Sequence, residues 1–103
     1  MIGQIEAGKR VRTQREWLYF SDVREMAKVL TPKRLELLKT IRDHHPESVR
    51  AVAELTGRNV KNVAEGLGLL ASLGLVEMKE NGGPSRKKIP RVGYGTLTVE
   101  VHL

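Results

Sequence analysis

Residues 48–76 read SVRAVAELTGRNVKNVAEGLGLLASLGLV, and the remainder of the chain can be placed around them. Apolar residues recur here at helical spacing in two runs. The first run holds Val49, Val52, Ala53 and Leu55, and the second holds Val60, Val63, Ala64, Leu67 and Leu70. Gly57 separates the runs and can take the positive φ that ends a helix. The pattern predicts a short helix, a tight turn, a second helix over about 59–73 and, after Gly74, the first strand of a hairpin.

The second helix is expected to leave a polar group on its outer side. Asn59, Lys61, Asn62 and Glu65 fall between the apolar positions. In a DNA-binding helix-turn-helix, outward residues at the N-terminal end of the second helix meet base edges in the major groove. These residues are therefore candidate DNA contacts, with Arg58 just before them.

Length and charge limit the possible classes of protein. A chain of 103 residues has room for one domain. The net charge of +6 and the pI near 10.0 favour a polyanionic partner such as nucleic acid. The chain has no cysteine, which excludes disulfides and thiolate metal sites. No apolar run reaches the roughly 20 residues of a membrane span and no signal-peptide pattern is present, so we expect a cytoplasmic protein with no membrane partner.

The N-terminal residues 1–15 are predicted to form a flexible basic arm ahead of one domain over 16–103. Lys9, Arg10 and Arg12 stand there with little apolar periodicity. Such an arm can follow DNA phosphates or enter a minor groove, and a mobile terminus without a ligand is the alternative.

Two strands are expected outside the central motif. Residues 16–20 hold three of the chain's aromatic side chains, and residues 96–103 alternate strictly between apolar and polar. We predict that the two strands pair, or that one of them pairs across a dimer. Trp17 and Tyr19 are expected to be buried on one face, as core residues rather than as a stacking platform for bases.

Two further helices are predicted before the central motif. Ser21 and Asp22 can cap a helix over 23–29, and Thr31 with Pro32 starts one over 32–44. The residues expected to face inward are Val23, Met26, Ala27 and Leu30 in the first, and Leu35, Leu38, Ile41 and Arg42 in the second. Lys33 and Arg34 are expected to be exposed at the start of the second helix, where they can contact phosphates.

A basic hairpin is predicted after the central motif. Strands over 75–79 and 86–89 flank a turn at 81–84, and Pro90 and Gly93 are expected to interrupt pairing. Arg86, Lys87, Lys88 and Arg91 gather here without an acidic residue among them. Such a hairpin can reach a minor groove or flanking phosphates, and a solvated run of charge is the alternative.

No enzyme chemistry is predicted. His44 and His45 point to different sides of a helix end, where they would cap it, and no carboxylate stands at metal-ligand spacing to them. Gly66, Gly68 and Ala71 match the dinucleotide fingerprint by letter, but they lie inside a helix rather than between a strand and a helix. We therefore expect no catalytic residue, no cofactor and no metal.

Four segments give the chain a family resemblance. LTPKRLELL at 30–38, SVRAVAELTG at 48–57, NVKNV at 59–63 and the spacing LxxLGLV at 70–76 resemble small winged helix-turn-helix regulators of archaea and bacteria. These regulators stand near the MarR and ArsR superfamily, and some act as antitoxins. The resemblance covers about residues 20–76. It implies DNA binding, often by a dimer, and in the antitoxin setting a toxin partner; Lys61 and Asn62 match its motif.

The later part of the second helix departs from that family pattern. Ala64, Glu65, Gly66 and Gly68 stand where related chains carry polar and charged residues. Two glycines inside a helix cost roughly 1 kcal/mol each relative to alanine, and Glu65 has the wrong sign for phosphate. Shallow contact with the groove is therefore expected.

These observations predict a mostly α fold with a small β-wing, a winged helix-turn-helix whose C-terminal strand pairs with an N-terminal strand. The predicted function is a homodimeric transcriptional regulator that binds double-stranded DNA. Its predicted contacts are Arg58, Asn59, Lys61, Asn62, Arg86, Lys87, Lys88, Lys33 and Arg34. The alternative is a protein-interaction module such as an antitoxin holding a toxin, for which Gly66, Gly68 and Leu69 would allow close approach, and RNA binding is a third possibility.

Overall fold

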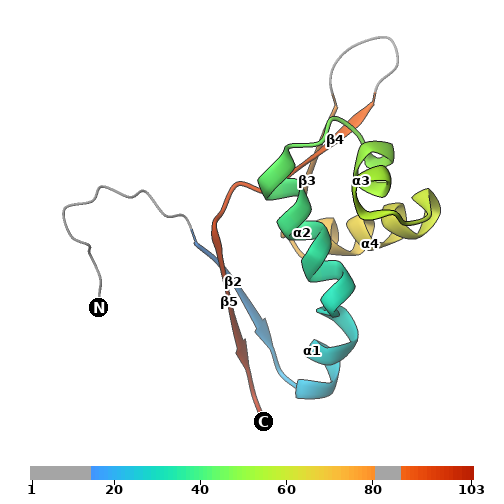
Figure 1. Ribbon diagram of the computed structural model, residues 1–103. Helices are drawn as coiled ribbons and strands as arrows, with labels where there is room; N and C mark the ends of the chain where they lie inside the picture. The colour runs from blue at the N-terminus through green and yellow to red at the C-terminus, as the bar shows by residue number, and fades with distance from the viewer. Residues whose placement is uncertain (1–14, 81–86) are drawn as a thin grey trace, which may run out of the picture.

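The computed structural model describes residues 15–80 and 87–103, which form four helices and two small two-stranded sheets. The order along the chain is β2 (Arg15–Phe20), α1 (Val23–Val29), α2 (Pro32–His44), α3 (Val49–Thr56), α4 (Val60–Ser72), β3 (Glu77–Glu80), β4 (Lys88–Arg91) and β5 (Thr96–Val101). Figure 1 shows α2, α3 and α4 grouped together, with β2 and β5 side by side along the flank of α1 and α2. Residues 1–14 of the predicted arm over 1–15, the turn at 81–84 and Arg86 lie outside the described residues, whereas Arg15 belongs to β2.

Each helix begins at a residue whose side chain accepts a hydrogen bond from the first turn. Asp22, Thr31, Ser48 and Asn59 are the N-caps of α1, α2, α3 and α4. Such caps satisfy backbone N–H groups that have no partner inside the helix. The predicted helix bounds at 23–29 and 32–44 are confirmed, and they follow from these caps and from Pro32 at the start of α2.

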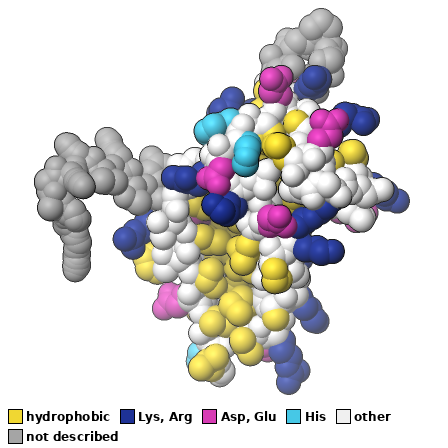
Figure 2. Space-filling view, viewed as in Figure 1, with side chains coloured by type: hydrophobic (Ala, Val, Ile, Leu, Met, Phe, Trp, Pro, Cys, Tyr) yellow, Lys and Arg dark blue, Asp and Glu magenta, His cyan; other side chains and the backbone are white. Residues whose placement is uncertain are grey.

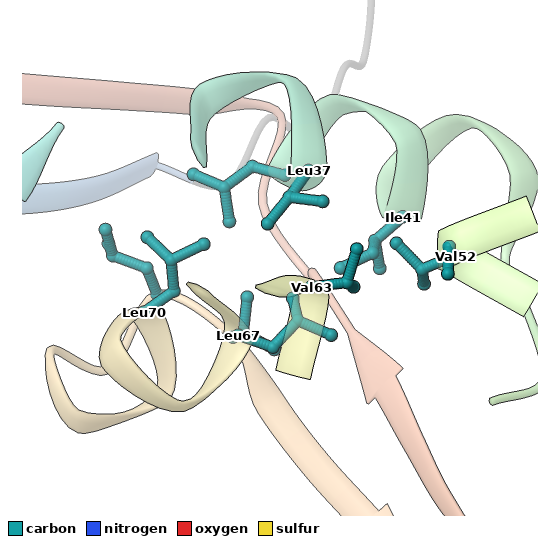
Figure 3. Close-up of a cluster of buried hydrophobic side chains, with 10 residues drawn as sticks. Leu37, Ile41, Val52, Val63, Leu67 and Leu70 are labelled. Atoms are coloured by element: carbon teal, nitrogen blue, oxygen red, sulfur yellow. The ribbon is translucent and has the colours of Figure 1, made fainter. Parts of the chain in front are cut away.

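The hydrophobic core lies between α2, α3 and α4. Figure 3 shows Leu37 and Ile41 of α2, Val52 of α3, and Val63, Leu67 and Leu70 of α4 pointing toward one another. Leu38, Ala53, Leu75 and Val76 complete the buried cluster. Removing this apolar surface from water is the main stabilising contribution to the group of helices.

Several predicted inward positions are wrong, because neighbouring elements cover only one side of each helix. Leu35 is 41% exposed, and Leu37, which was not predicted to be buried, takes its place in the core. Leu55 is 50% exposed, and Arg42, which was expected on the inward stripe of α2, is exposed as well. Ala64 is exposed as well, and Gly66 is buried on α4 instead. In α1, Val23 and Ala27 are exposed, so the prediction for these two is wrong, whereas Met26 is half-buried and Leu30, just after the helix, packs against the core as expected.

The predicted pairing of the two outer strands occurs within the chain. β2 and β5 run parallel, with Arg15 opposite Thr96 and Phe20 opposite Val101, so β2 begins one residue earlier than the predicted domain boundary. Phe20 is buried, but Trp17 and Tyr19 are 60% and 62% exposed. The predicted burial of these two aromatic side chains is therefore wrong, because no described element covers their face of the sheet.

The hairpin of β3 and β4 is antiparallel, and its strands begin two residues later than the predicted strands at 75–79 and 86–89, because Leu75 and Val76 are buried in the core ahead of β3. Pro90 was expected to interrupt pairing, but it lies inside β4 opposite Met78 and is buried. Proline is tolerated in an edge strand, where the missing N–H is not required by a second neighbour. β4 packs against α2 and α3.

Tyr94 ties the segment between β4 and β5 to the helices. Its hydroxyl donates to the Leu75 carbonyl at 2.8 Å, and its own carbonyl accepts from Nε of Arg42 at 3.1 Å. Burial, with a smaller contribution from Glu16, raises the pKa of Tyr94 to about 12. No helix among residues 15–80 and 87–103 is long and apolar enough to cross a membrane.

Candidate nucleic-acid interface

The turn between α3 and α4 brings polar residues to the start of α4. Gly57 has φ of 68°, which an L side chain rarely adopts, and its N–H donates to the carbonyls of Ala53 and Glu54. The Arg58 N–H also donates to the Ala53 carbonyl, at 3.0 Å. The turn is therefore closed within two residues, and α4 begins at a fixed angle to α3.

Asn59 is the N-cap of α4. Its Oδ1 accepts from the backbone N–H of Lys61 at 2.8 Å and of Asn62 at 3.3 Å. The oxygen of this side chain is thus used by the helix, which leaves only the amide N–H groups for a ligand. The side chains of Lys61 and Asn62 are exposed, and no described hydrogen bond or ion pair uses either of them.

Arg58 has a structural role in addition to its predicted one. Its Nη1 donates to the Lys33 carbonyl at 3.0 Å and its Nη2 is paired with the Glu36 carboxylate. The side chain is only 20% exposed. Arg58 therefore holds the α3–α4 turn against α2, and most of its hydrogen-bonding capacity is already occupied.

Arg34 is likewise engaged within the chain. Its Nη1 donates to the carbonyls of Lys28 at 2.8 Å and Val29 at 2.9 Å, at the end of α1. The guanidinium thus satisfies carbonyls that would otherwise lack a partner at that helix end. It was predicted to be exposed, but it is half-buried because α1 ends beside it.

An open groove of about 500 Å³ runs between the start of α2 and the start of α4. It is lined by Thr31, Lys33, Arg34, Leu37, Arg58, Asn59, Asn62, Val63, Glu65 and Gly66. Five of the predicted contact residues therefore surround one depression, with Lys61 on the exposed helix surface beyond it. We call this depression the α2–α4 groove.

The hairpin is less basic than its sequence indicated. Lys88 stands opposite Glu80 and Arg91 stands opposite Glu77, so each cation of β4 has a carboxylate on the neighbouring strand. Opposite charges at such cross-strand positions attract each other. Lys87 and Lys88 are exposed at the end of the hairpin. Sequence reasoning missed these opposing carboxylates because it considered 86–91 without the strand that pairs with it.

Positive side chains lie on both sides of the molecule in Figure 2, mixed with acidic ones. Figure 2 shows Lys and Arg spaced along the edge formed by the hairpin base, α3, α4 and α1, with Asp and Glu side chains between them. Arg50, in the first turn of α3, is an exposed cation that the sequence analysis did not select. The charged side chains thus form a mixed surface with an excess of positive charge, and not a single cationic patch.

Thr31 is a groove residue that sequence reasoning did not propose as part of the site, whereas Glu65 was already expected on the outer side of α4. Thr31 was identified as the cap of α2, but only the packing of α2 against α4 reveals that it borders the groove. Gly66 allows this close approach, since a Cβ there would come within 3.0 Å of Leu37 Cδ1. Gly66 therefore serves packing inside the chain, while Gly68 faces open space with nothing within 4 Å.

The histidines show no arrangement for metal. His44 ends α2 and His45 is its C-cap, with φ of 48° and its N–H donating to the Ile41 carbonyl. Within the described parts of the chain, no group of three His, Cys, Asp or Glu residues is placed to hold a metal ion.

Comparison with known proteins shows the family of this chain. No curated protein matches this chain. A family model described as HVO_A0114 matches residues 29–99, from the last residue of α1 to the fourth residue of β5. The matched region includes the helices of the core, the α2–α4 groove and the hairpin, and it covers well over half of the chain. The chain therefore belongs to the HVO_A0114 family.

Proposed function

We propose that this protein is a transcriptional regulator that binds double-stranded DNA through a winged helix-turn-helix, in which α3 and α4 form the helix-turn-helix and β3–β4 forms the wing. The observation that carries the proposal is the exposed start of α4. Lys61 and Asn62 extend from a capped and rigidly connected helix end, with Lys33 across the α2–α4 groove. The resemblance to MarR-like and ArsR-like regulators supports the same function.

The mechanism follows from the residues that remain available. Lys61 and Asn62 approach base edges or phosphates in the major groove, and the backbone N–H groups at the start of α4 favour negative charge. Lys33 contacts a phosphate and sets the position of the helix without reading sequence. Glu65 borders the same groove and repels phosphate, which restricts insertion to the first turn of α4.

Arg58 and Arg34 act mainly as supports in this proposal. Each is bound to backbone carbonyls of another helix, so their guanidinium groups fix the relative positions of α1, α2 and α4. Lys87 and Lys88 contribute contacts from the wing, which are weakened for Lys88 by Glu80 on the opposite strand.

A salt titration of duplex binding tests the proposal. Binding of the purified protein to specific and random duplexes is measured by fluorescence anisotropy at salt concentrations from about 50 to 200 mM. If about three to five phosphates are contacted, log K should fall linearly against log salt with a slope of about −3 to −5. Absence of duplex binding, or an affinity unaffected by salt, would rule the proposal out.

Lys61→Ala tests the position of the interface. If Lys61 contacts a phosphate, the variant should bind more weakly and its salt slope should decrease by about one unit. Lys39→Ala is the matched control, because Lys39 is an exposed α2 lysine paired with Asp43 at 2.8 Å and lies outside the groove. Equal slopes for both variants and the unmodified protein would remove Lys61 from the interface.

A second candidate function is the binding of a protein partner, as in an antitoxin. Exposed apolar side chains at Leu55 and Val60 flank the α3–α4 turn, and Gly68 leaves open space on α4. Gly68→Trp would block a partner there and leave the first turn of α4 unchanged. Unimpaired DNA binding by this variant, together with loss of a co-purifying protein, would favour this second function.

A further inference from the structure

The outer face of the β2–β5 sheet carries two exposed aromatic side chains. Trp17 and Tyr19 are 60% and 62% exposed, and they alternate with Leu18, so both lie on the same face of β2. Exposing two large aromatic side chains to water forgoes a substantial part of the free energy that their burial would supply. Their placement indicates a surface that is covered in the functional state.

The opposite face of the same sheet is also apolar. Leu18 and Leu97 pack against the core, while Val99 and Val101 are half-buried. Figure 2 shows hydrophobic side chains gathered where the β2–β5 sheet meets α1 and α2. β2 carries apolar residues on both faces, which is typical of strands covered on both sides, while β5 presents Thr96, Thr98 and Glu100 to the outer face. Within residues 15–80 and 87–103, helices approach only the inner face.

We propose that a second copy of this chain covers the outer face, so that two β2–β5 sheets pack against each other around a two-fold axis. Charge at the two ends of the face supports this occupant. Arg15 lies at the start of β2, and Glu100 lies opposite Tyr19 near the other end. A surface with a cation at one end, an anion at the other and aromatic rings between them is complementary to itself after a half-turn.

The register fixes which residues meet. Trp17 is opposite Thr98, halfway between the levels of Arg15 and Tyr19. We place the two-fold axis between the two sheets, perpendicular to the strands and at the level of Trp17, so that Trp17 contacts Trp17 of the second copy. The same rotation places Arg15 above the partner's Tyr19. The partner's Glu100 lies beside that tyrosine, on the neighbouring strand, and is therefore also close to Arg15. The guanidinium can then interact with both the ring and the carboxylate. In the described residues, no ion pair involves Arg15 or Glu100 within one chain.

The size of the face sets the strength of this dimer. Six residues on two strands cover roughly 20 Å by 10 Å, well below the ~800 Å² per partner of a standard interface. The contact is therefore weak and concentration-dependent, with a dissociation constant on the order of 100 μM. The dimer proposal goes beyond the proposed DNA binding. Because dimerisation is measured without DNA, a failure of one proposal can be distinguished from a failure of the other.

Stacking of single-stranded nucleic acid on the same rings is less favoured by the charge of this face. Glu100 lies directly beside Tyr19, where its carboxylate repels the phosphates of a strand stacked there. The same carboxylate is favourable in the dimer, because it meets Arg15 of the second copy.

Sedimentation equilibrium of the full chain between about 1 and 500 μM tests the inference, with the bounds chosen around the expected dissociation constant. Tyr19→Ser and Trp17→Ser should raise that constant about tenfold or more, while Leu55→Ser should leave it unchanged. Leu55 is the matched control because it is an exposed apolar residue on α3. Circular dichroism confirms that each variant is folded.

Fluorescence provides a second measurement, because Trp17 is the only tryptophan in the chain. Its emission should shift to shorter wavelength as the unmodified protein is concentrated, and this shift should be absent in Tyr19→Ser. A shift in Tyr19→Ser as large as in the unmodified protein would contradict the proposed surface.

Charge exchange distinguishes this surface from any other. Arg15→Glu and Glu100→Arg alone should each weaken the dimer about tenfold or more, and the double variant should restore it. Failure of the double variant to recover would overturn the two-fold arrangement. A protein that stays monomeric at 500 μM would overturn the proposed dimer. Loss of the dimer in Val99→Ser but not in Trp17→Ser would overturn the choice of the outer face, because Val99 lies on the inner face. Quenching of Trp17 by a single-stranded oligonucleotide in a monomeric protein would replace the second copy with nucleic acid.

Discussion

Arg58 joins the turn before α4 to α2 through the Lys33 carbonyl and the Glu36 carboxylate. Because the side chain is mostly buried, Arg58→Ala should lower the free energy of unfolding by about 1 to 2 kcal/mol. Urea denaturation measures the change. Glu36→Ala should cost less, since Glu36 is largely exposed, and a double-mutant cycle isolates the pair. Weaker DNA binding in Arg58→Ala without a loss of stability would identify Arg58 as a direct contact instead of a support.

Tyr94 makes stability depend on pH at the alkaline end. Its pKa is raised from 10.0 to about 12, first by burial and then by Glu16. The folded state therefore holds this proton more tightly than the unfolded state. The resulting stabilisation is complete below pH 10 and is lost as the pH rises through about 12.

Tyr94→Phe tests this dependence. The variant loses the hydrogen bond to the Leu75 carbonyl and should be about 1 kcal/mol less stable at neutral pH. The difference between the two proteins in urea denaturation should narrow above pH 10, because only the unmodified protein loses a proton at this position. A difference that stays constant to pH 12 would contradict the assignment.

At the residue scale, the sequence identified polar and basic residues of the candidate interface, but not the groups within the chain to which some of them are bound. Lys61 and Asn62 could be chosen because helical spacing predicts which positions face outward. Arg34 and Arg58 could not be separated from them, because their carbonyl partners lie on other helices. The same limit applies to Lys88, whose opposing carboxylate Glu80 becomes visible only when the hairpin register is known.

At the scale of elements, the two glycines of α4 have different environments, so their replacement by alanine should change the free energy of unfolding in opposite directions. Gly68→Ala should raise the free energy of unfolding by about 0.5 to 1 kcal/mol, since alanine is the better helix former and nothing lies within 4 Å of the new Cβ. Gly66→Ala gains the same propensity, but its Cβ would stand 3.0 Å from Leu37 Cδ1 in the core.

Thermal denaturation of the two variants side by side provides the measurement. Gly66→Ala should be less stable than Gly68→Ala by about 1 kcal/mol or more, and the order of the two is the decisive result. Leu37→Val should recover part of the loss in Gly66→Ala by removing the crowded methyl group. Equal stabilisation by both alanines would show that α2 and α4 are not in close contact at Gly66.

Helix bounds were predictable because caps, proline and the turn glycine act locally. Asp22, Thr31, Ser48 and Asn59 determine helix starts through their own neighbours in sequence. Strand faces were less predictable, because alternation reveals two faces but not which face another element covers. Trp17 and Tyr19 show this, since an aromatic pair expected in the core lies on an exposed face.

At the scale of the whole molecule, the two proposals together predict the form of the DNA site. A two-fold dimer presents two copies of α4, so the preferred site should be an inverted repeat with half-sites about one helical turn apart, or a multiple of that spacing. Selection from random duplexes, followed by sequencing, measures this preference. Tyr19→Ser should retain binding to one half-site and lose the preference for a fixed spacing, because the second copy is no longer held in place. Selection of single, unpaired half-sites by the unmodified protein would contradict this form.

The parallel pairing of β2 with β5 also has a consequence for how the chain folds. The helices and the hairpin are formed from contacts between neighbouring segments, whereas Arg15 and Thr96 come together only after almost the whole chain between them is ordered. Contacts so distant in sequence slow folding, because the entropy of closing the loop is lost before any pairing compensates for it. During synthesis, α2, α3 and α4 can therefore assemble on the ribosome while β2 waits for β5 to emerge. Until β5 has been synthesised, β2 and its exposed Trp17 have no strand to pair with, and this segment is the most prone to aggregation.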